Sequence, residues 1–144
     1  MKKNYHLYLG KAGHLTVMSE FLTRGWNVAI PEVDVGDDIF VVQDDNGTLR
    51  RVQVKTSTST QRQNGFSGQF NVPLKQLRNM ANIPVHYVFI VRNSDLWTKP
   101  VIIRQDYLLD YLQNDSHTKD KIACSGLDLS KYISDFNDFP FIEE

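Results

Sequence analysis

The sequence has little cysteine and no long apolar run, and these absences narrow the classes of protein to which it can belong. The single cysteine among 144 residues, Cys124, excludes an internal disulfide and fits a reducing compartment. That cysteine and four scattered histidines provide no zinc-binding spacing. No stretch approaches the ~18 apolar residues of a membrane helix, and no apolar segment follows the N-terminal lysines. We therefore expect a cytoplasmic protein with no membrane span and no signal peptide.

The composition is that of one globular domain with an uneven distribution of charge. Apolar residues make up 41% and charged residues 23% of the chain, and no repeat or linker divides residues 1–144. Residues 1–104 carry 13 Lys and Arg against 8 Asp and Glu, whereas residues 105–144 carry 3 against 9. A polyanion such as DNA is therefore expected to contact the first part. The alternative is an acidic, solvated tail without a role of its own.

A β-hairpin is predicted over residues 34–55, DVGDDIFVVQDDNGTLRRVQVK. The dipeptide Asn46-Gly47 suits a two-residue type I′ turn, which would place Asp38 opposite Lys55. A four-residue loop, Asp44–Gly47, would shift the partners without changing which side chains share a face. In either case one face is apolar and belongs in a core (Ile39, Val41, Val52 and Val54), and the other carries Asp38, Phe40, Gln53 and Lys55.

The second face brings together a carboxylate, an amide oxygen and an ammonium group. Mg²⁺ takes hard oxygen ligands such as those of Asp38 and Gln53, and a neighbouring lysine can stabilise charge that develops on a phosphate. The alternative interpretation is an Asp38–Lys55 ion pair across the strands, worth ~0.2–1 kcal/mol. In the link before the hairpin, Glu32 and Asp34 are further candidate carboxylates.

Residues 9–57 resemble the PD-(D/E)XK nuclease superfamily, through LGKAGH at the start of a helix, then RGWNVAIP, DVGDD and a hairpin that ends in VQVKTS. The resemblance implies an α/β, restriction-endonuclease-like fold with an α-β-β-β-α-β core, in which a central mixed sheet is flanked by helices. It also implies that Asp38 is the motif aspartate, with Asp37 as the alternative, and that Gln53 and Lys55 are the (D/E)XK pair. The implied function is Mg²⁺-dependent or Mn²⁺-dependent cleavage of DNA, with Asp38 and Gln53 holding the metal.

Two positions depart from the pattern of this superfamily. Gln53 stands where most members have an acidic residue, although Q-x-K variants occur in branches of the family that resemble resolvases and modification-dependent restriction enzymes. His14 stands where many relatives carry a glutamate that helps to hold the metal, and it is our fourth candidate catalytic residue. The alternative function is therefore a catalytically degenerate nuclease-fold domain that acts as a nucleic-acid-binding or protein-interaction module.

The rest of the chain predicts a series of short elements. We expect a helix over residues 11–24 with an apolar face, a strand over 26–30, and a mobile polar loop over 56–69. A short strand over 70–72, a helix that begins at Pro73, a strand over 85–91 buried on both faces, a strand over 99–103 and a helix over 106–112 follow. The apolar face of the first helix is expected to consist of Ala12, Leu15, Val17, Met18, Phe21 and Leu22.

Five further cationic side chains are candidates for contacts with DNA phosphates. They are Arg50, Arg51, Arg62, Lys75 and Arg78.

Two further features concern possible protein partners. A homodimer is one possibility, since nucleases of this type often cut two strands as dimers, but no interface is evident in the sequence. Residues from about 115 to 144 form an acidic, aromatic extension in which the phenylalanines either pack on the domain or bind a partner.

Overall fold

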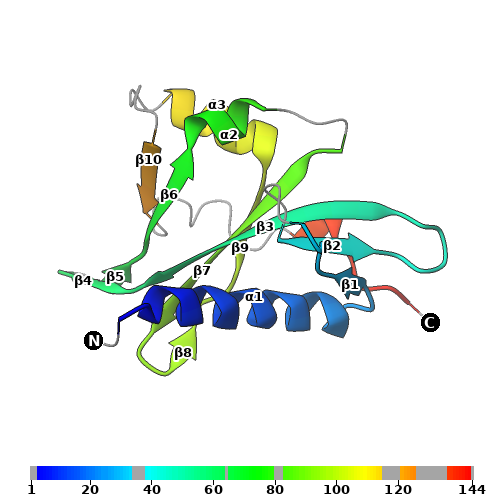
Figure 1. The fold of residues 1–144 in the computed structure, drawn as a ribbon, viewed down its shortest axis with the longest axis horizontal. Coiled ribbons are helices and arrows are strands. Elements are labelled where there is room, and N and C mark those ends of the chain that lie inside the picture. The colour runs from blue at the N-terminus through cyan, green and yellow to red at the C-terminus, as the bar shows by residue number, and fades with distance from the viewer. Residues whose placement is uncertain are drawn as a thin grey trace.

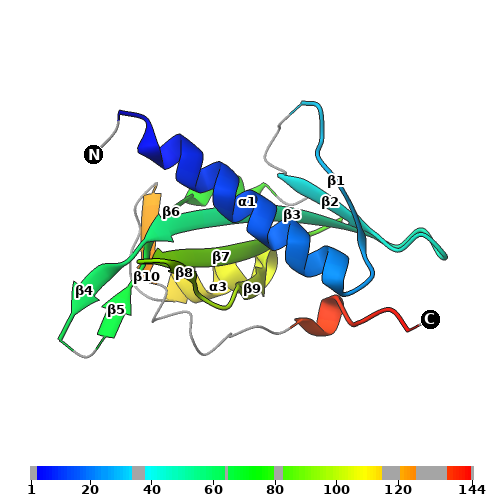
Figure 2. The ribbon, with the colours of Figure 1, turned by 90° about the horizontal axis from the view of Figure 1, so that it is seen from below.

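The computed structural model describes residues 3–33, 38–63, 65–79, 83–114, 121–125 and 136–143. A central mixed sheet carries helix α1 on one face and helices α2 and α3 on the other (Figures 1 and 2). No helix in these residues is both long enough and apolar enough to cross a bilayer. The elements in chain order are α1 (Tyr5–Thr23), β1 (Asn27–Ala29), β2 (Ile39–Val42), β3 (Leu49–Thr58), β4 (Thr60–Arg62), β5 (Gly65–Ser67), β6 (Gln69–Pro73), α2 (Leu74–Arg78), β7 (Val85–Asn93), β8 (Leu96–Trp97), β9 (Val101–Arg104), α3 (Gln105–Asn114), β10 (Lys121–Ser125) and the 3₁₀ turn η2 (Phe136–Asp138).

The order of the strands confirms the expected mixed α/β architecture. The main sheet runs β1-β2-β3-β7-β8, and β9 also pairs with β7. Strands β1, β2 and β3 are antiparallel, and β3 then pairs in parallel with β7, from Arg51 opposite Val85 to Thr58 opposite Arg92. The sequence α1, β1, β2, β3, α2, β7 is the predicted α-β-β-β-α-β order, with β4, β5 and β6 inserted before α2.

Strand β7 separates two hydrophobic cores, as its uniformly apolar sequence predicted. Residues 85–91 are all buried, and successive side chains alternate between the two faces of the sheet. Val88 and Ile90 pack on the α1 face, whereas Tyr87 and Phe89 pack with α2 and α3. A strand covered on both faces has no polar side to present, which accounts for the run VHYVFIV.

Hairpin β2–β3 has the four-residue loop, so the two-residue turn was the wrong choice of the two. Gln43 N donates to Thr48 O at 2.9 Å and Gly47 N donates to Gln43 O at 2.8 Å, which closes the loop over Asp44–Gly47. Only Gly47 has a positive φ in this loop, 70°, whereas a type I′ turn requires positive φ at both Asn46 and Gly47. Ile39 therefore lies opposite Val52, and the apolar face keeps its predicted members Ile39, Val41, Val52 and Val54. Asp38 precedes β2 and does not follow the predicted alternation.

Helix α1 is longer than predicted and buries a narrower face. It begins at Tyr5 rather than near Lys11, and its buried residues are Gly13, Val17 and Phe21, four residues apart. Leu15 and Leu22 were expected in the core but are 52% and 53% exposed. Apolar side chains occur all round this helix, so their spacing did not reveal which of them face the sheet.

The polar segment after Lys55 is ordered, contrary to the expected mobile loop. Strand β3 continues to Thr58, and β4 and β5 then form a short hairpin with Thr60 opposite Ser67. The segment gains backbone hydrogen bonds rather than apolar burial, which an argument from composition alone does not register. Pro73 is the residue before α2 rather than its first residue, and Leu74 and Leu77 of this helix are buried.

The C-terminal residues 136–143 pack against the domain beside α1 and β1 (Figure 2). Phe139 is fully buried, and Trp26 Nε1 donates to the carbonyl oxygen of Pro140 at 2.8 Å. Ile142 N donates to Arg24 O at 2.8 Å. Of the two alternatives for this segment, the structure shows packing on the domain, although Phe141 stays 63% exposed.

His86 is a buried histidine within the apolar strand β7. Its side chain is 4% exposed, and Nε2 donates to the Asp138 carboxylate at 2.9 Å, which joins β7 to η2. Burial lowers the pKa of His86, because the charged imidazolium loses hydration, and the contact with Asp138 opposes that effect only in part. His86 thus belongs to the C-terminal packing rather than to a site around Asp38.

Candidate active site

Asp38 is fixed at the point where strand β2 begins beside β3. Its backbone N–H donates to Val52 O at 2.9 Å, and its carboxylate Oδ2 accepts from Val54 N at 2.7 Å. The carboxylate therefore lies against the edge of β3. One contact holds the backbone of Asp38 and the other holds its carboxylate, so β3 sets the position of this residue.

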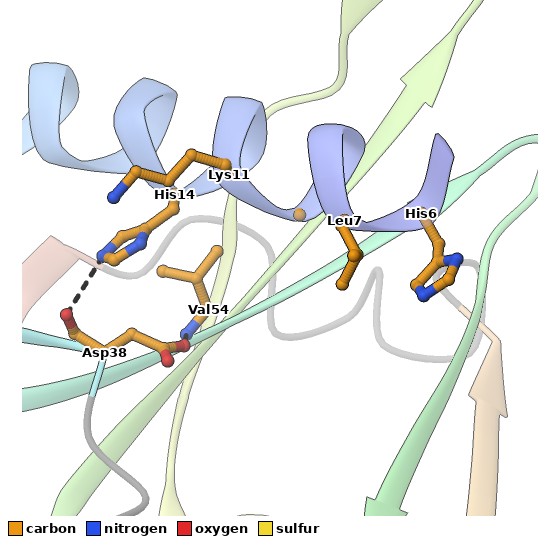
Figure 3. Close-up of a pocket in the computed structure, with 7 residues that line it drawn as sticks. His6, Leu7, Lys11, His14, Asp38 and Val54 are labelled. Atoms are coloured by element: carbon orange, nitrogen blue, oxygen red, sulfur yellow. Dashed lines mark hydrogen bonds between the residues drawn. The ribbon is translucent and has the colours of Figure 1, made fainter. Parts of the chain in front are cut away.

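Helix α1 contacts the same residue through His14. The ring atom Nε2 of His14 lies 3.0 Å from the backbone oxygen of Asp38 (Figure 3). Because a carbonyl oxygen only accepts, Nε2 carries the proton in this contact. His14 thus ties α1 to the start of β2 and helps to position Asp38, while its Nε2 has no lone pair to offer a metal.

An open pocket lies between α1 and the Asp38 carboxylate (Figure 3). Its volume is about 340 Å³. The side formed by α1 carries two histidines and a lysine, and the opposite side is formed by Asp38 and Val54. The lining residues are His6, Leu7, Gly10, Lys11, His14, Asp38 and Val54.

Gln53 and Lys55 are turned toward the other face of the sheet. They lie opposite Tyr87 and Phe89 in the parallel β3–β7 register, and paired residues of neighbouring strands project to the same side. That is the face covered by α2 and α3, whereas Val54 between them lines the pocket under α1. The structure thus brings Asp38 into contact with His14 and Val54. Because the backbone N–H groups of a strand lie in the plane of the sheet, the carboxylate bonded to Val54 N sits at the edge of β3, between the pocket face and the face from which Gln53 and Lys55 project.

The amide of Gln53 has a defined partner in helix α2. Gln53 is 9% exposed, and its Oε1 accepts a hydrogen bond from Gln76 Nε2 at 3.0 Å. Helix α2 is in turn held by Gln105, whose Nε2 donates to Leu77 O at 3.0 Å. Sequence reasoning missed Gln76 and Gln105, because a lone glutamine in a short polar stretch carries no local signal of its partner.

The candidate phosphate contacts lie on three elements: β3, the β4–β5 hairpin and α2. Arg62 donates to Ser67 Oγ at 2.8 Å within the β4–β5 hairpin, and Arg51 donates to Ile83 O at 3.2 Å. Arg50 is half-buried on β3. Lys75 and Arg78 do lie together, because both line a surface pocket of about 580 Å³ on α2 that Gln76 also borders. Among the other carboxylates, Glu32 is exposed, and Asp34 and Asp37 lie outside the described residues.

Two pocket residues, His6 and Lys11, were missed by the analysis of the sequence. A helix predicted to begin at Lys11 left His6 in an extended lead-in, with no reason to face the same side as His14. Because the helix begins at Tyr5, the side chains of His6, Lys11 and His14 all line the pocket. The available signal was the spacing of His6, Gly10 and His14, four residues apart, which puts them on one helical face.

Gly13 allows α1 to approach β3 closely enough for these contacts. A Cβ atom at Gly13 would lie 2.0 Å from Thr56 Cγ2, so Gly13→Ala must push the helix or Thr56 aside. We expect Gly13→Ala to lower the free energy of unfolding by about 1–3 kcal/mol, because over-packing of the α1–β3 contact outweighs the better helix propensity of alanine. Chemical denaturation measures this loss.

Gly10 provides the matched control. A Cβ there would lie 3.9 Å from Thr56 Oγ1, an ordinary contact, so Gly10→Ala should be neutral or stabilising by up to about 1 kcal/mol. Adding Thr56→Ala should restore much of the stability lost in Gly13→Ala, since it removes the clashing methyl group. Equal stability of Gly10→Ala and Gly13→Ala would show that the close contact does not constrain α1.

The donor atoms at the site suit a hard cation better than a soft one. Within the described residues, no group of three or more His, Cys, Asp and Glu side chains is placed to hold a metal ion. The oxygens of Asp38 and Gln53 are ligands of the kind that Mg²⁺ prefers, and Mg²⁺ commonly takes one or two carboxylates with water and phosphate. Such a sparse protein shell fits Mg²⁺ or Mn²⁺ and does not resemble a zinc site.

The chain was compared with known protein families, curated proteins and solved structures. The sequence matches no protein family and no curated protein. Among solved structures, the chain is similar to a bacterial homing endonuclease, I-Ssp6803I, with a TM-score of 0.50 and 18% sequence identity. The fold is nuclease-like. The aligned region covers 85% of this chain and 78% of the endonuclease, so the likeness extends well beyond the hairpin and includes most of the domain.

Proposed function

We propose that this protein is a metal-dependent endonuclease of the PD-(D/E)XK type, which hydrolyses phosphodiester bonds in DNA. The observation that supports this most is the anchoring of the Asp38 carboxylate on Val54 N, between Gln53 and Lys55 along β3. A rigid carboxylate beside a Q-x-K strand, in a domain with a nuclease-like fold, is the arrangement that such hydrolysis needs.

Each residue has a distinct role in this proposal. Asp38 and the Gln53 side-chain oxygen would hold Mg²⁺ or Mn²⁺, and Gln76 would orient the Gln53 amide by occupying only one of the two lone pairs on Oε1. When bound, the metal ion lowers the pKa of a coordinated water and stabilises charge on the phosphate. Lys55 would stabilise the negative charge that develops on the phosphate oxygens, and His14 would keep Asp38 in place.

The role of Lys55 is tested by comparing two lysine variants. Lys55→Ala should lower the rate of Mg²⁺-dependent cleavage by about 10²–10³-fold, because it removes a charge aimed at the developing negative charge. Lys99→Ala removes an exposed lysine between β8 and β9 and should retain the wild-type rate. Cleavage is measured on DNA in supercoiled, linear, single-stranded and branched forms. Equal rates for the two variants would remove Lys55 from the mechanism.

A second candidate function is a nucleic-acid-binding domain without cleavage. Two contacts favour it: the proton of His14 Nε2 is directed at a backbone oxygen, and an amide at Gln53 supplies no second carboxylate. This alternative implies DNA binding that weakens with salt, is indifferent to Mg²⁺ and never leads to strand breaks.

A further inference from the structure

We infer that the N-terminal half of α1 binds the phosphate backbone of a DNA strand beside Asp38, mainly through Lys11 and His6. The inference rests on the proposed function, since it places the substrate of that same site. It places the phosphates that flank the reacting one on the α1 side of the sheet, whereas the phosphate contacts expected from the sequence lie on β3, on the β4–β5 hairpin and on α2.

The shape of the helix surface suits a polyanion strand. At about 100° per residue, His6, Lys11 and His14 fall within an arc of ~140° on α1. Gly10 lies inside this arc, has no side chain and lines the pocket together with these residues. A Cβ atom at Gly10 would lie 3.9 Å from its nearest neighbour, Thr56 Oγ1, so the pocket is open at this position.

The donors along this surface are available for a ligand. His6 and Lys11 are exposed, and neither side chain makes a hydrogen bond or an ion pair within the residues that the structure describes. Lysine and neutral or protonated histidine are both donors to phosphate oxygens. By contrast, Arg51 and Arg62, two of the earlier candidates, donate to the protein itself.

Asp38 determines which phosphates these donors contact. Its carboxylate lines the same pocket and would repel a phosphate placed directly against it. Lys11 and His6 are therefore assigned to the phosphates that flank the one at Asp38. From His6 to His14 the helix rises ~12 Å, and a strand of B-DNA advances about 3.4 Å per nucleotide, so the surface spans about three nucleotides.

The test measures equilibrium binding without cleavage. Fluorescence anisotropy of a labelled DNA duplex and a labelled single strand is recorded in EDTA, between about 50 and 200 mM salt. One phosphate contact contributes ~0.9 to the slope of log Kobs against log salt for a duplex, which is about eightfold in affinity near 0.1 M salt. Lys11→Ala should reduce both the slope and the affinity by about these amounts, and Lys11→Glu should reduce the affinity further. His6→Ala should also weaken binding.

Lys99→Ala is the matched control and should leave both affinity and slope unchanged. Wild-type slopes and affinities for Lys11→Ala and His6→Ala would overturn the inference, even if the wild-type protein cleaves DNA. Loss of binding in these variants would support it, even if no cleavage is found with any metal. A wild-type protein that binds neither DNA at the lowest salt would overturn the inference and the proposed function together.

Discussion

Asp38→Asn is expected to lower the rate of Mg²⁺-dependent DNA cleavage by about 10³-fold or more. The substitution removes the one carboxylate that the described residues place at the pocket between α1 and β3. It keeps an oxygen that can accept the hydrogen bond from Val54 N, now 2.7 Å from the carboxylate. The loss should therefore reflect metal binding and charge rather than unfolding, and titration with Mn²⁺ should show weakened binding.

Asp45→Asn is the matched control for this prediction. Asp45 lies on the same hairpin, in the loop at its opposite end, and is exposed. The Asp45→Asn variant should cleave DNA at the wild-type rate. The free energies of unfolding of both variants should lie within about 1 kcal/mol of that of the wild-type protein. A comparable rate for Asp38→Asn and the wild-type protein would show that the chemistry does not depend on this carboxylate.

Phe139→Ala is expected to lower the free energy of unfolding by about 3–5 kcal/mol, with a drop in Tm of roughly 10 °C. Phe139 is fully buried, and its ring centroid lies 4.8 Å from that of Phe21, 5.5 Å from Trp26 and 4.9 Å from His86. Truncation would leave a cavity where α1, β1 and β7 meet the C-terminal segment. Thermal and chemical denaturation measure the effect.

Phe141 provides a control of the same residue type two positions away. Its ring is 63% exposed and lies beneath the Arg24 guanidinium, whose central carbon is 4.4 Å from the ring centroid. Phe141→Ala should lose about 0.5–1 kcal/mol, the value of an exposed cation–π contact. Similar losses for the two variants would contradict the role of residues 136–143 as part of the core, and would favour an exposed tail that binds a partner.

The hairpin and the buried strand were predictable because the pattern of apolar residues determines which faces they bury. Apolar side chains at Ile39, Val41 and Val52 must share a face for any even-length loop, so the core face was predicted correctly although the partner of each residue was not. The run over Val85–Val91 has only one stable environment, burial on both sides. The fold class itself was an implication of the resemblance of residues 9–57, with which the order of the predicted elements agreed.

The site was less predictable, because its contacts join residues that lie far apart in the sequence. His14 contacts the backbone of Asp38 and Gln76 contacts Gln53, and neither contact follows from side-chain spacing within one element. The burial of Gly13 instead of Leu15 on α1 was not predictable for the same reason, because the close approach of α1 to β3 depends on Thr56 in that strand. The alternation rule placed Asp38 with Gln53 and Lys55, but Asp38 precedes β2 and its carboxylate bonds to the edge of β3.

The composition of the inserted segment β4–β6 did not indicate that it forms strands. Residues 56–69 are mostly polar and can bury little apolar surface. Strands β4 and β5 nevertheless pair through their backbones, and Ser67 is buried. Strand pairing satisfies backbone groups regardless of side-chain polarity. A polar stretch next to a long strand is therefore weak evidence for a loop.

The most direct test of this account is cleavage of a mixed panel of supercoiled, linear, single-stranded and branched DNA by the wild-type protein in Mg²⁺, Mn²⁺ or EDTA. The account predicts strand breaks in at least one substrate with either metal ion and none in EDTA. Intact DNA under every condition, from a protein that unfolds cooperatively and is therefore folded at the start, would contradict it. That result would leave a nuclease-like fold that binds nucleic acid without cutting it.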